Sequence, residues 1–258
     1  MRLMKRILSA AAVLALSASL LVGCSSGTAS SVPVSASSAA ESTVSSVEKT
    51  ASSAVDENEA AAAQLLNDLS GSYQELWPVI LADEYKQTWL DDCTALVGED
   101  NAEAAFEKLS SMVTGDVYGE DAVKAYANGG GAYFCGFTNS LAILTFDGET
   151  STISGTDKDG NVLFSHTYHY IGMEPVRGLY EFQSDDADSG EFTYFFLAPD
   201  TSAETYHIEF RYGSDAEALS QYDTGEYAYW LASGISTDCD QTMIDNCIEL
   251  FCTENLAG

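Results

Sequence analysis

Seven short β-strand patterns, each separated from the next by a turn signal, constrain the fold more than any other feature of this sequence. They cover residues 132–137, 141–146, 151–155, 162–171, 178–183, 192–198 and 205–211. Asp147-Gly148 and Asp159-Gly160 are dipeptides typical of tight β-hairpin turns. Short adjacent strands linked in this way favour an antiparallel sheet that closes into a barrel, because closure leaves no unpaired sheet edge.

Helical patterns lie on both sides of these strands. Four precede them, at residues 60–69, 84–97, 101–113 and 120–127, and two follow, at residues 214–221 and 240–252. The last helix carries an apolar stripe of Met243, Ile244, Cys247, Ile248 and Phe251. Asp238 and Asp240 stand at its start, where the helix dipole favours negative charge. The expected fold is mostly β, with a helical N-terminal region, an antiparallel barrel and a C-terminal helix.

The first 24 residues predict a bacterial lipoprotein signal peptide. Arg2, Lys5 and Arg6 precede an apolar stretch at residues 7–21, and the sequence Leu-Val-Gly-Cys then ends at Cys24. We expect cleavage before Cys24 and lipidation of that residue, with several acyl chains anchoring the protein stably to the outside of the membrane. The alternative is an ordinary signal peptide with a chance cysteine.

Residues 25–57 are rich in Ser, Ala, Thr and Val and hold almost no large apolar side chains. Such a segment cannot bury enough surface to offset its ordering entropy. We therefore expect a disordered tether at residues 25–57 and one folded domain at residues 58–258.

The chain is strongly acidic, with 40 Asp and Glu residues against 10 Lys and Arg residues and a net charge of −30. Nucleic acids and anionic lipid headgroups repel such a surface, so neither is an expected partner of the folded domain. The same surface attracts cations weakly and without selectivity.

Five cysteines follow Cys24: Cys93, Cys135, Cys239, Cys247 and Cys252. Outside the cytoplasm disulfides are permitted, but an odd number leaves at least one thiol unpaired within the chain. Cys247 and Cys252 are five residues apart on the predicted last helix, so they point in different directions and should not bridge each other. One or two disulfides and several buried free thiols remain alternatives.

The last predicted strand, together with the one before it, carries the most informative polar residues. With a period of two, Tyr206, Ile208 and Phe210 share one face of residues 205–210, and Thr205, His207 and Glu209 share the other. A histidine and a carboxylate on one strand face are a starting point for a metal site. A hydrogen-bonded surface histidine is the alternative.

Three segments, in order along the chain, match one known pattern. They are LSGSYQELWP at residues 69–78, YHYIG with RGLYEF within residues 168–182, and DDADSGEFTY with ETYHIEFRYG within residues 185–213. Together they resemble the ZinT family of extracytoplasmic zinc-binding domains, which occur alone or fused behind zinc-transporter solute-binding lipoproteins. The resemblance implies a calycin-like antiparallel β-barrel with helices packed on it.

The resemblance also implies a ligand set. The family binds zinc through a histidine in the inter-strand loop and a His-x-His pair on the next strand. The last of these matches His207, the first of the pair falls on Thr205, and the loop histidine falls near Asp200. Threonine is a poor zinc ligand, whereas aspartate binds through oxygen. We add Glu209 from strand periodicity, and His169 for the case in which its strand neighbours that of His207.

Two outcomes therefore remain. Either a site for zinc or another divalent cation survives with altered ligands and lower affinity, or the barrel no longer binds metal and takes a small ligand or a partner protein. The resemblance implies zinc buffering, or delivery of zinc to components of a zinc ABC importer. The chain contains no GxSxG, P-loop or HExxH sequence, so we expect no enzymatic activity.

Overall fold

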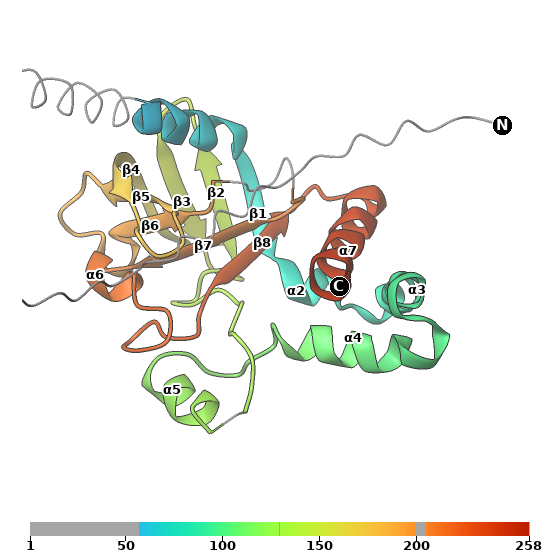
Figure 1. Cartoon of the computed structure of the whole chain (residues 1–258). Coiled ribbons are helices and arrows are strands. Elements are labelled where there is room, and N and C mark those ends of the chain that lie inside the picture. Colours follow the sequence, from blue (N-terminus) through green and yellow to red (C-terminus); the bar gives the residue numbers. More distant parts are fainter. Residues whose placement is uncertain (1–56, 129, 200–204, 258) are drawn as a thin grey trace, which may run out of the picture. The chain divides into compact units, whose positions relative to one another are not determined.

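A computed structural model describes residues 57–128, 130–199 and 205–257 (Figure 1). The predicted signal peptide, the predicted lipidation site Cys24 and nearly all of the predicted tether lie outside these residues, as does Asp200. Among the described helices, none combines the length and the apolar composition needed to cross a bilayer.

In the described part of the chain, eight antiparallel strands form a closed barrel. They are β1 (Gly71–Glu75), β2 (Ile143–Asp147), β3 (Thr152–Thr156), β4 (Val162–Met173), β5 (Tyr180–Ser184), β6 (Tyr194–Leu197), β7 (Ile208–Gly213) and β8 (Ala232–Ser236). Each strand pairs with its neighbours in the sequence, and β1 pairs with β8 to close the ring. The predicted antiparallel barrel with flanking helices is confirmed.

Aromatic side chains fill the barrel. Phe195, Phe210 and Tyr212 are fully buried, and the rings of Phe195 and Tyr212 stack with centroids 5.3 Å apart. Phe164 and Phe192 stack at 3.9 Å. Each such side chain contributes roughly 1.5–3 kcal/mol through burial. The barrel interior is therefore a packed core of side chains, as in other small barrels.

The helices are α2 (Leu76–Ile80), α3 (Lys86–Val97), α4 (Ala102–Ser111), α5 (Glu120–Tyr126), α6 (Ala216–Leu219) and α7 (Gln241–Leu256). All but α2, which was not predicted, agree closely with the sequence patterns. Single 3₁₀ turns are η1 (Asp83–Tyr85), η2 (Glu99–Asn101) and η3 (Gly190–Phe192). Residues 57–68 are also helical, and this helix packs on the barrel core through Leu65 and Leu66.

A second apolar core lies among α2, α3, α4 and α7, which sit together beside β8 (Figure 1). The ring of Phe251 contacts both Trp77 and Trp89, with centroids 4.8 and 6.0 Å apart. The indole nitrogen of Trp89 donates to the carbonyl oxygen of Ile80 at 2.7 Å. The carboxylate of Asp240 accepts from the backbone N–H of Met243, so the predicted acidic start of the last helix is an N-cap.

The strand predictions were wrong at both ends of the barrel sequence. The segment 132–137 is no strand, since Phe134 makes only isolated bridges to Thr114 and Trp230. Both β1 and β8 were missed. Strand β1 is five residues long and runs directly into α2, while β8 reads Ala-Ser-Gly-Ile-Ser and has few β-branched or aromatic residues. Closure of the barrel, rather than local propensity, makes these two segments strands.

Candidate metal-binding site around His207

The backbone before β7 differs from the predicted strand. Strand β7 begins at Ile208, and Tyr206 has a φ angle of +63°, in the left-handed region. That conformation costs a non-glycine residue roughly 1–2 kcal/mol and interrupts the alternation of side chains. Tyr206 packs with the helical core and not with Ile208 and Phe210 in the barrel. The prediction of a regular strand from residue 205, with Tyr206 on the same face as Ile208 and Phe210, is therefore wrong.

One ring nitrogen of His207 is hydrogen-bonded to a backbone carbonyl, and the other faces a carboxylate. Its side chain is 16 % exposed and lies between the barrel and α7. Nδ1 lies 2.6 Å from the carbonyl oxygen of Thr205. A carbonyl only accepts, so Nδ1 carries the hydrogen, and in the neutral ring Nε2 keeps the lone pair. Nε2 lies 3.7 Å from Oε1 of Glu209.

Thr205 contributes through its backbone. Its carbonyl oxygen accepts from His207, and its hydroxyl donates to the carbonyl oxygen of His207 at 3.0 Å. Metal-binding histidines generally donate their second ring N–H to a carboxylate or a backbone carbonyl, which fixes the tautomer and the ring orientation. Thr205 supplies that orienting contact, a role that its side-chain chemistry did not suggest.

Two groups raise the affinity of His207 for protons. Burial by itself lowers the pKa of the imidazole, but hydrogen bonding to Cys247 and Glu209 and the charges of both groups outweigh it and raise the pKa to about 10. The ring is therefore protonated at neutral pH in the metal-free protein. A cation that binds Nε2 must displace that proton, which weakens binding at low pH.

The described residues supply two of the donors that zinc needs. Tetrahedral zinc with ligands at about 2.0–2.2 Å places nitrogen and oxygen donors about 3.4 Å apart, close to the 3.7 Å that separates Nε2 of His207 from Glu209. The Glu209 side chain is 44 % exposed and free to move by a few tenths of an ångström. In the part of the chain that the structure describes, no three His, Cys, Asp or Glu side chains converge into a metal-holding group.

Cys247 does not complete this pair. Its sulfur lies 3.9 Å from Nδ1 of His207, the ring nitrogen that donates to the carbonyl oxygen of Thr205. Among the described residues, His207, Glu209 and Cys247 do not form a metal-holding group of three. Sequence reasoning missed this contact because Cys247 is 40 residues away, on α7. The apolar stripe of α7 was the available signal, since it predicts that Cys247 faces the rest of the fold.

A cavity of about 350 Å³ lies beside Glu209, with Leu179 and Leu231 among its walls. It leaves room for water next to the carboxylate. Arg177 also lines it, and the Arg177 guanidinium is held 4.3 Å above the ring of Tyr222. A positive charge in the wall would oppose a cation bound there and would lower its affinity.

Arg211, on β7 two residues after Glu209, was not singled out from the sequence. It is fully buried, and its guanidinium donates to the carbonyl oxygens of Leu219, Gln221 and Tyr227. The guanidinium carbon of Arg211 lies 4.4 Å from the centroid of the Tyr222 ring. Burial lowers the pKa of Arg211. The side chain ties the segment after α6 to the barrel wall, which is a structural role.

The other two histidines lie on β4. Nδ1 of His166 and Nδ1 of His169 each lie 2.7 Å from a carboxylate, that of Asp186 and that of Asp185 respectively. In the barrel β5 and β6 separate β4 from β7, so the condition under which His169 was expected to join His207 is not met. Asp200 lies outside the described residues, and the structure does not test it as a ligand.

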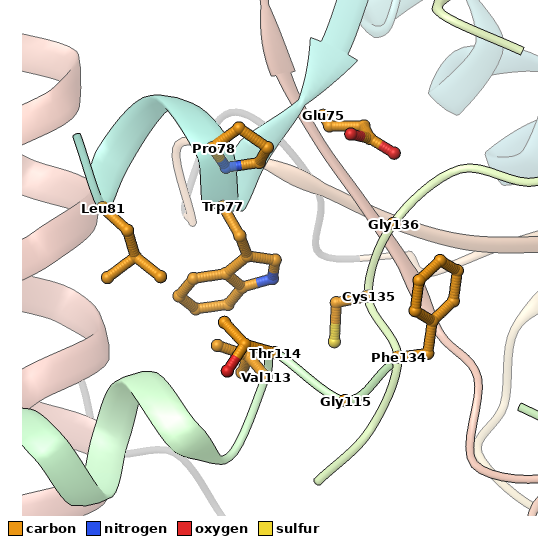
Figure 2. Close-up of a pocket in the computed structure, with 10 residues that line it drawn as sticks. All are labelled: Glu75, Trp77, Pro78, Leu81, Val113, Thr114, Gly115, Phe134, Cys135 and Gly136. Atoms are coloured by element: carbon orange, nitrogen blue, oxygen red, sulfur yellow. The ribbon is translucent and has the colours of Figure 1, made fainter. Parts of the chain in front are cut away.

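A second pocket, of about 360 Å³, lies between α2, the end of α4 and residues 134–136 (Figure 2). Trp77 and Leu81 form one side and Phe134 the other, with Glu75 at the edge. The indole N–H of Trp77 lies beside the thiol of Cys135 (Figure 2). Burial, with the charge of Glu209, raises the pKa of that thiol to about 12. The pocket is outside the barrel and mostly apolar.

No protein-family model and no curated protein matches this sequence. Among solved structures, the fold is similar to the Zn(II)-bound ZinT-like domain of Streptococcus pneumoniae AdcA, with a TM-score of 0.45 and 15 % identity over 71 % of this chain and 89 % of that one. It is also similar to Zn(II)-bound AdcA from Streptococcus pneumoniae, with a TM-score of 0.42 and 14 % identity over 75 % of this chain and 35 % of that one. Similarity at this level supports no conclusion about the ligands of this chain.

Proposed function

We propose that this chain binds zinc or another divalent cation, with Nε2 of His207 and the carboxylate of Glu209 as its protein ligands. The observation that carries the proposal is the orientation of one ring. The carbonyl of Thr205 fixes the hydrogen on Nδ1, and Nε2 then faces an acidic side chain at 3.7 Å. This arrangement is the one that presents an imidazole to a metal ion.

The donor set suits reversible binding. One nitrogen and one oxygen donor leave positions for water, and the proton on His207 competes with the ion. We therefore propose a buffering or delivery role, without catalysis, in which a zinc importer receives the ion. The leader sequence supports a lipid anchor at Cys24 and a location outside the cytoplasmic membrane.

Zinc titration of the purified full chain, by calorimetry at moderate salt, tests the proposal. The wild-type protein should show one site above the non-selective background of its acidic surface. His207→Gln should remove that site and leave the background. His169→Gln is the matched control, because the carboxylate partner of His169 is Asp185, which is not part of the candidate site. Equal binding by all three proteins would contradict the proposal.

A second candidate function rests on the pocket beside Trp77. The barrel interior is filled, so a small apolar ligand would bind between α2 and residues 134–136 instead (Figure 2). The neutral probe N-phenyl-1-naphthylamine should then gain fluorescence with the wild-type chain and lose that gain in Val113→Phe, which fills the pocket. Unchanged fluorescence with the wild-type chain would leave metal binding as the only proposed function.

A further inference from the structure

Two buried thiols meet where α3 packs against α7. Cys93 of α3 and Cys252 of α7 are both fully buried, and their sulfur atoms lie 3.9 Å apart. They are 159 residues apart in the sequence, near the two ends of the described fold. The contact belongs to the helical core and contains no group of the candidate metal-binding site.

The geometry of α7 keeps this pair apart from His207. An α-helix turns by about 100° per residue, so Cys247 and Cys252 point about 140° apart around the axis. Cys247 faces His207, while Cys252 faces α3. One helix thus presents one thiol to the barrel and another to its neighbouring helix.

We infer that Cys93 and Cys252 form an intramolecular disulfide that joins α3 to α7. The sulfur atoms need to approach by about 2 Å to reach the usual S–S length of about 2.05 Å. That approach lies within the reach of side-chain rotations at a helix–helix contact. The bond would link α3 to the C-terminal helix and close a loop that contains seven of the eight barrel strands, β2 to β8.

The bond forms by thiol–disulfide exchange with a small-molecule disulfide as the oxidant. The thiolate of one cysteine attacks the small disulfide, forms a mixed disulfide and releases one small thiol. The thiolate of the second cysteine then attacks the mixed disulfide and releases the other small thiol. Two protein thiols are oxidised, one small disulfide is reduced to two thiols, and the two protein protons end on the released thiolates.

Burial determines when this exchange occurs. It raises the pKa of both thiols, and only the thiolate attacks. In the packed protein neither sulfur is accessible to an oxidant, so we expect the mixed disulfide to form during folding, before α3 and α7 are fully packed, and the bond to close as the two helices come together. Once the helices pack, the same burial protects the bond from reducing agents.

Refolding of the reduced full chain with glutathione disulfide, followed by alkylation of the remaining thiols and peptide mapping, tests the inference. The peptide with Cys93 should be linked to the peptide with Cys252 and should be 2 Da lighter than the two reduced peptides together. Alkylation of both cysteines after oxidative refolding would overturn the inference, as would a dominant bond from either to another cysteine.

The melting temperature gives an independent measure. Closing so long a loop should raise the melting temperature of the oxidised protein by roughly 10 °C over the reduced protein. Cys239→Ala should keep this difference, and Cys93→Ala/Cys252→Ala should abolish it. Should the double variant fail to fold, the wild-type peptide map alone decides. Equal melting temperatures for linked and reduced wild-type protein would refute a stabilising role.

Discussion

His207, beside α7, and His166, on β4, differ in their partners and not in their exposure. His207 and His166 are each 16 % exposed. Nδ1 of His166 and of His169 meets a carboxylate, whereas Nδ1 of His207 meets a backbone carbonyl. Among the described contacts, a carboxylate lies near Nε2 in the case of His207 alone. Burial therefore does not identify a metal-binding imidazole, while the distribution of donors around the ring does.

Glu209→Gln is the strongest way to test this contrast. We expect zinc affinity to fall by roughly 100-fold, because the amide removes the negative donor beside Nε2. Loss of a residue that only orients a ligand costs about 10- to 100-fold, so loss of a ligand itself should reach the upper end of that range. Calorimetric titration measures it. Asp186→Asn is the matched control, since it changes the carboxylate beside His166, and it should alter affinity less than twofold. Equal losses in the two variants would show that net charge alone attracts the metal.

The pH dependence of stability, measured without metal, tests how the surroundings of His207 affect its protonation. Burial opposes protonation of His207, but Cys247 and Glu209 raise its pKa to about 10, above the value of about 6.5 in an unfolded chain. The folded state thus binds the proton more tightly than the unfolded chain does. The contribution of protonated His207 to the free energy of unfolding is complete below about pH 6.5 and is lost as the pH rises through about 10.

Denaturant unfolding of the wild type and of His207→Gln measures that contribution. We expect the wild type to be more stable by about 2 kcal/mol at pH 6, a typical value for hydrogen bonds to a charged group. The difference should shrink steadily as the pH approaches 10. A difference that grows between pH 6 and pH 10 would mean that the folded protein holds the ring neutral.

The sequence predicted the parts of the fold that local chemistry determines. In β7, the aromatic residues Phe210 and Tyr212 stand at alternate positions and mark the barrel face, and the stripe of α7 marks its buried side. Strand β8 could not be predicted, because its small residues become a strand only when β1 and β7 pair with it.

The candidate site was predictable only in part. His207 and Glu209 came from a spacing of two residues, and the structure does place them together, although Tyr206 breaks the strand that was assumed to align them. The contact with Cys247 depends on how α7 packs on the barrel, which no local pattern encodes. The contact between His207 and the carbonyl oxygen of Thr205 could not be predicted from the sequence either, because every residue has a backbone carbonyl.

Removing the thiol beside His207 tests how far the ring depends on α7. Cys247 is almost fully buried, so Cys247→Ala should lower the free energy of unfolding by about 1 kcal/mol through lost packing. Zinc affinity should stay within about threefold, because the contact of the sulfur with the ring is at Nδ1, whereas Glu209 faces Nε2. Unfolding and zinc titration on the same sample measure both. A large loss of affinity without a change in stability would make Cys247 a ligand and move the site to Nδ1.

The smallest effect is expected at the exposed pair on β4. The side chains of His169 and Asp185 are each 53 % exposed, and exposed ion pairs contribute at most about 1 kcal/mol. Asp185→Asn should therefore change the free energy of unfolding by less than about 0.5 kcal/mol and leave zinc affinity unchanged. Denaturant unfolding and titration provide the two measurements. If Asp185→Asn instead weakened zinc binding as much as Glu209→Gln, a carboxylate beside Nδ1 would serve as well as one beside Nε2, and the distinction between the two regions would fail.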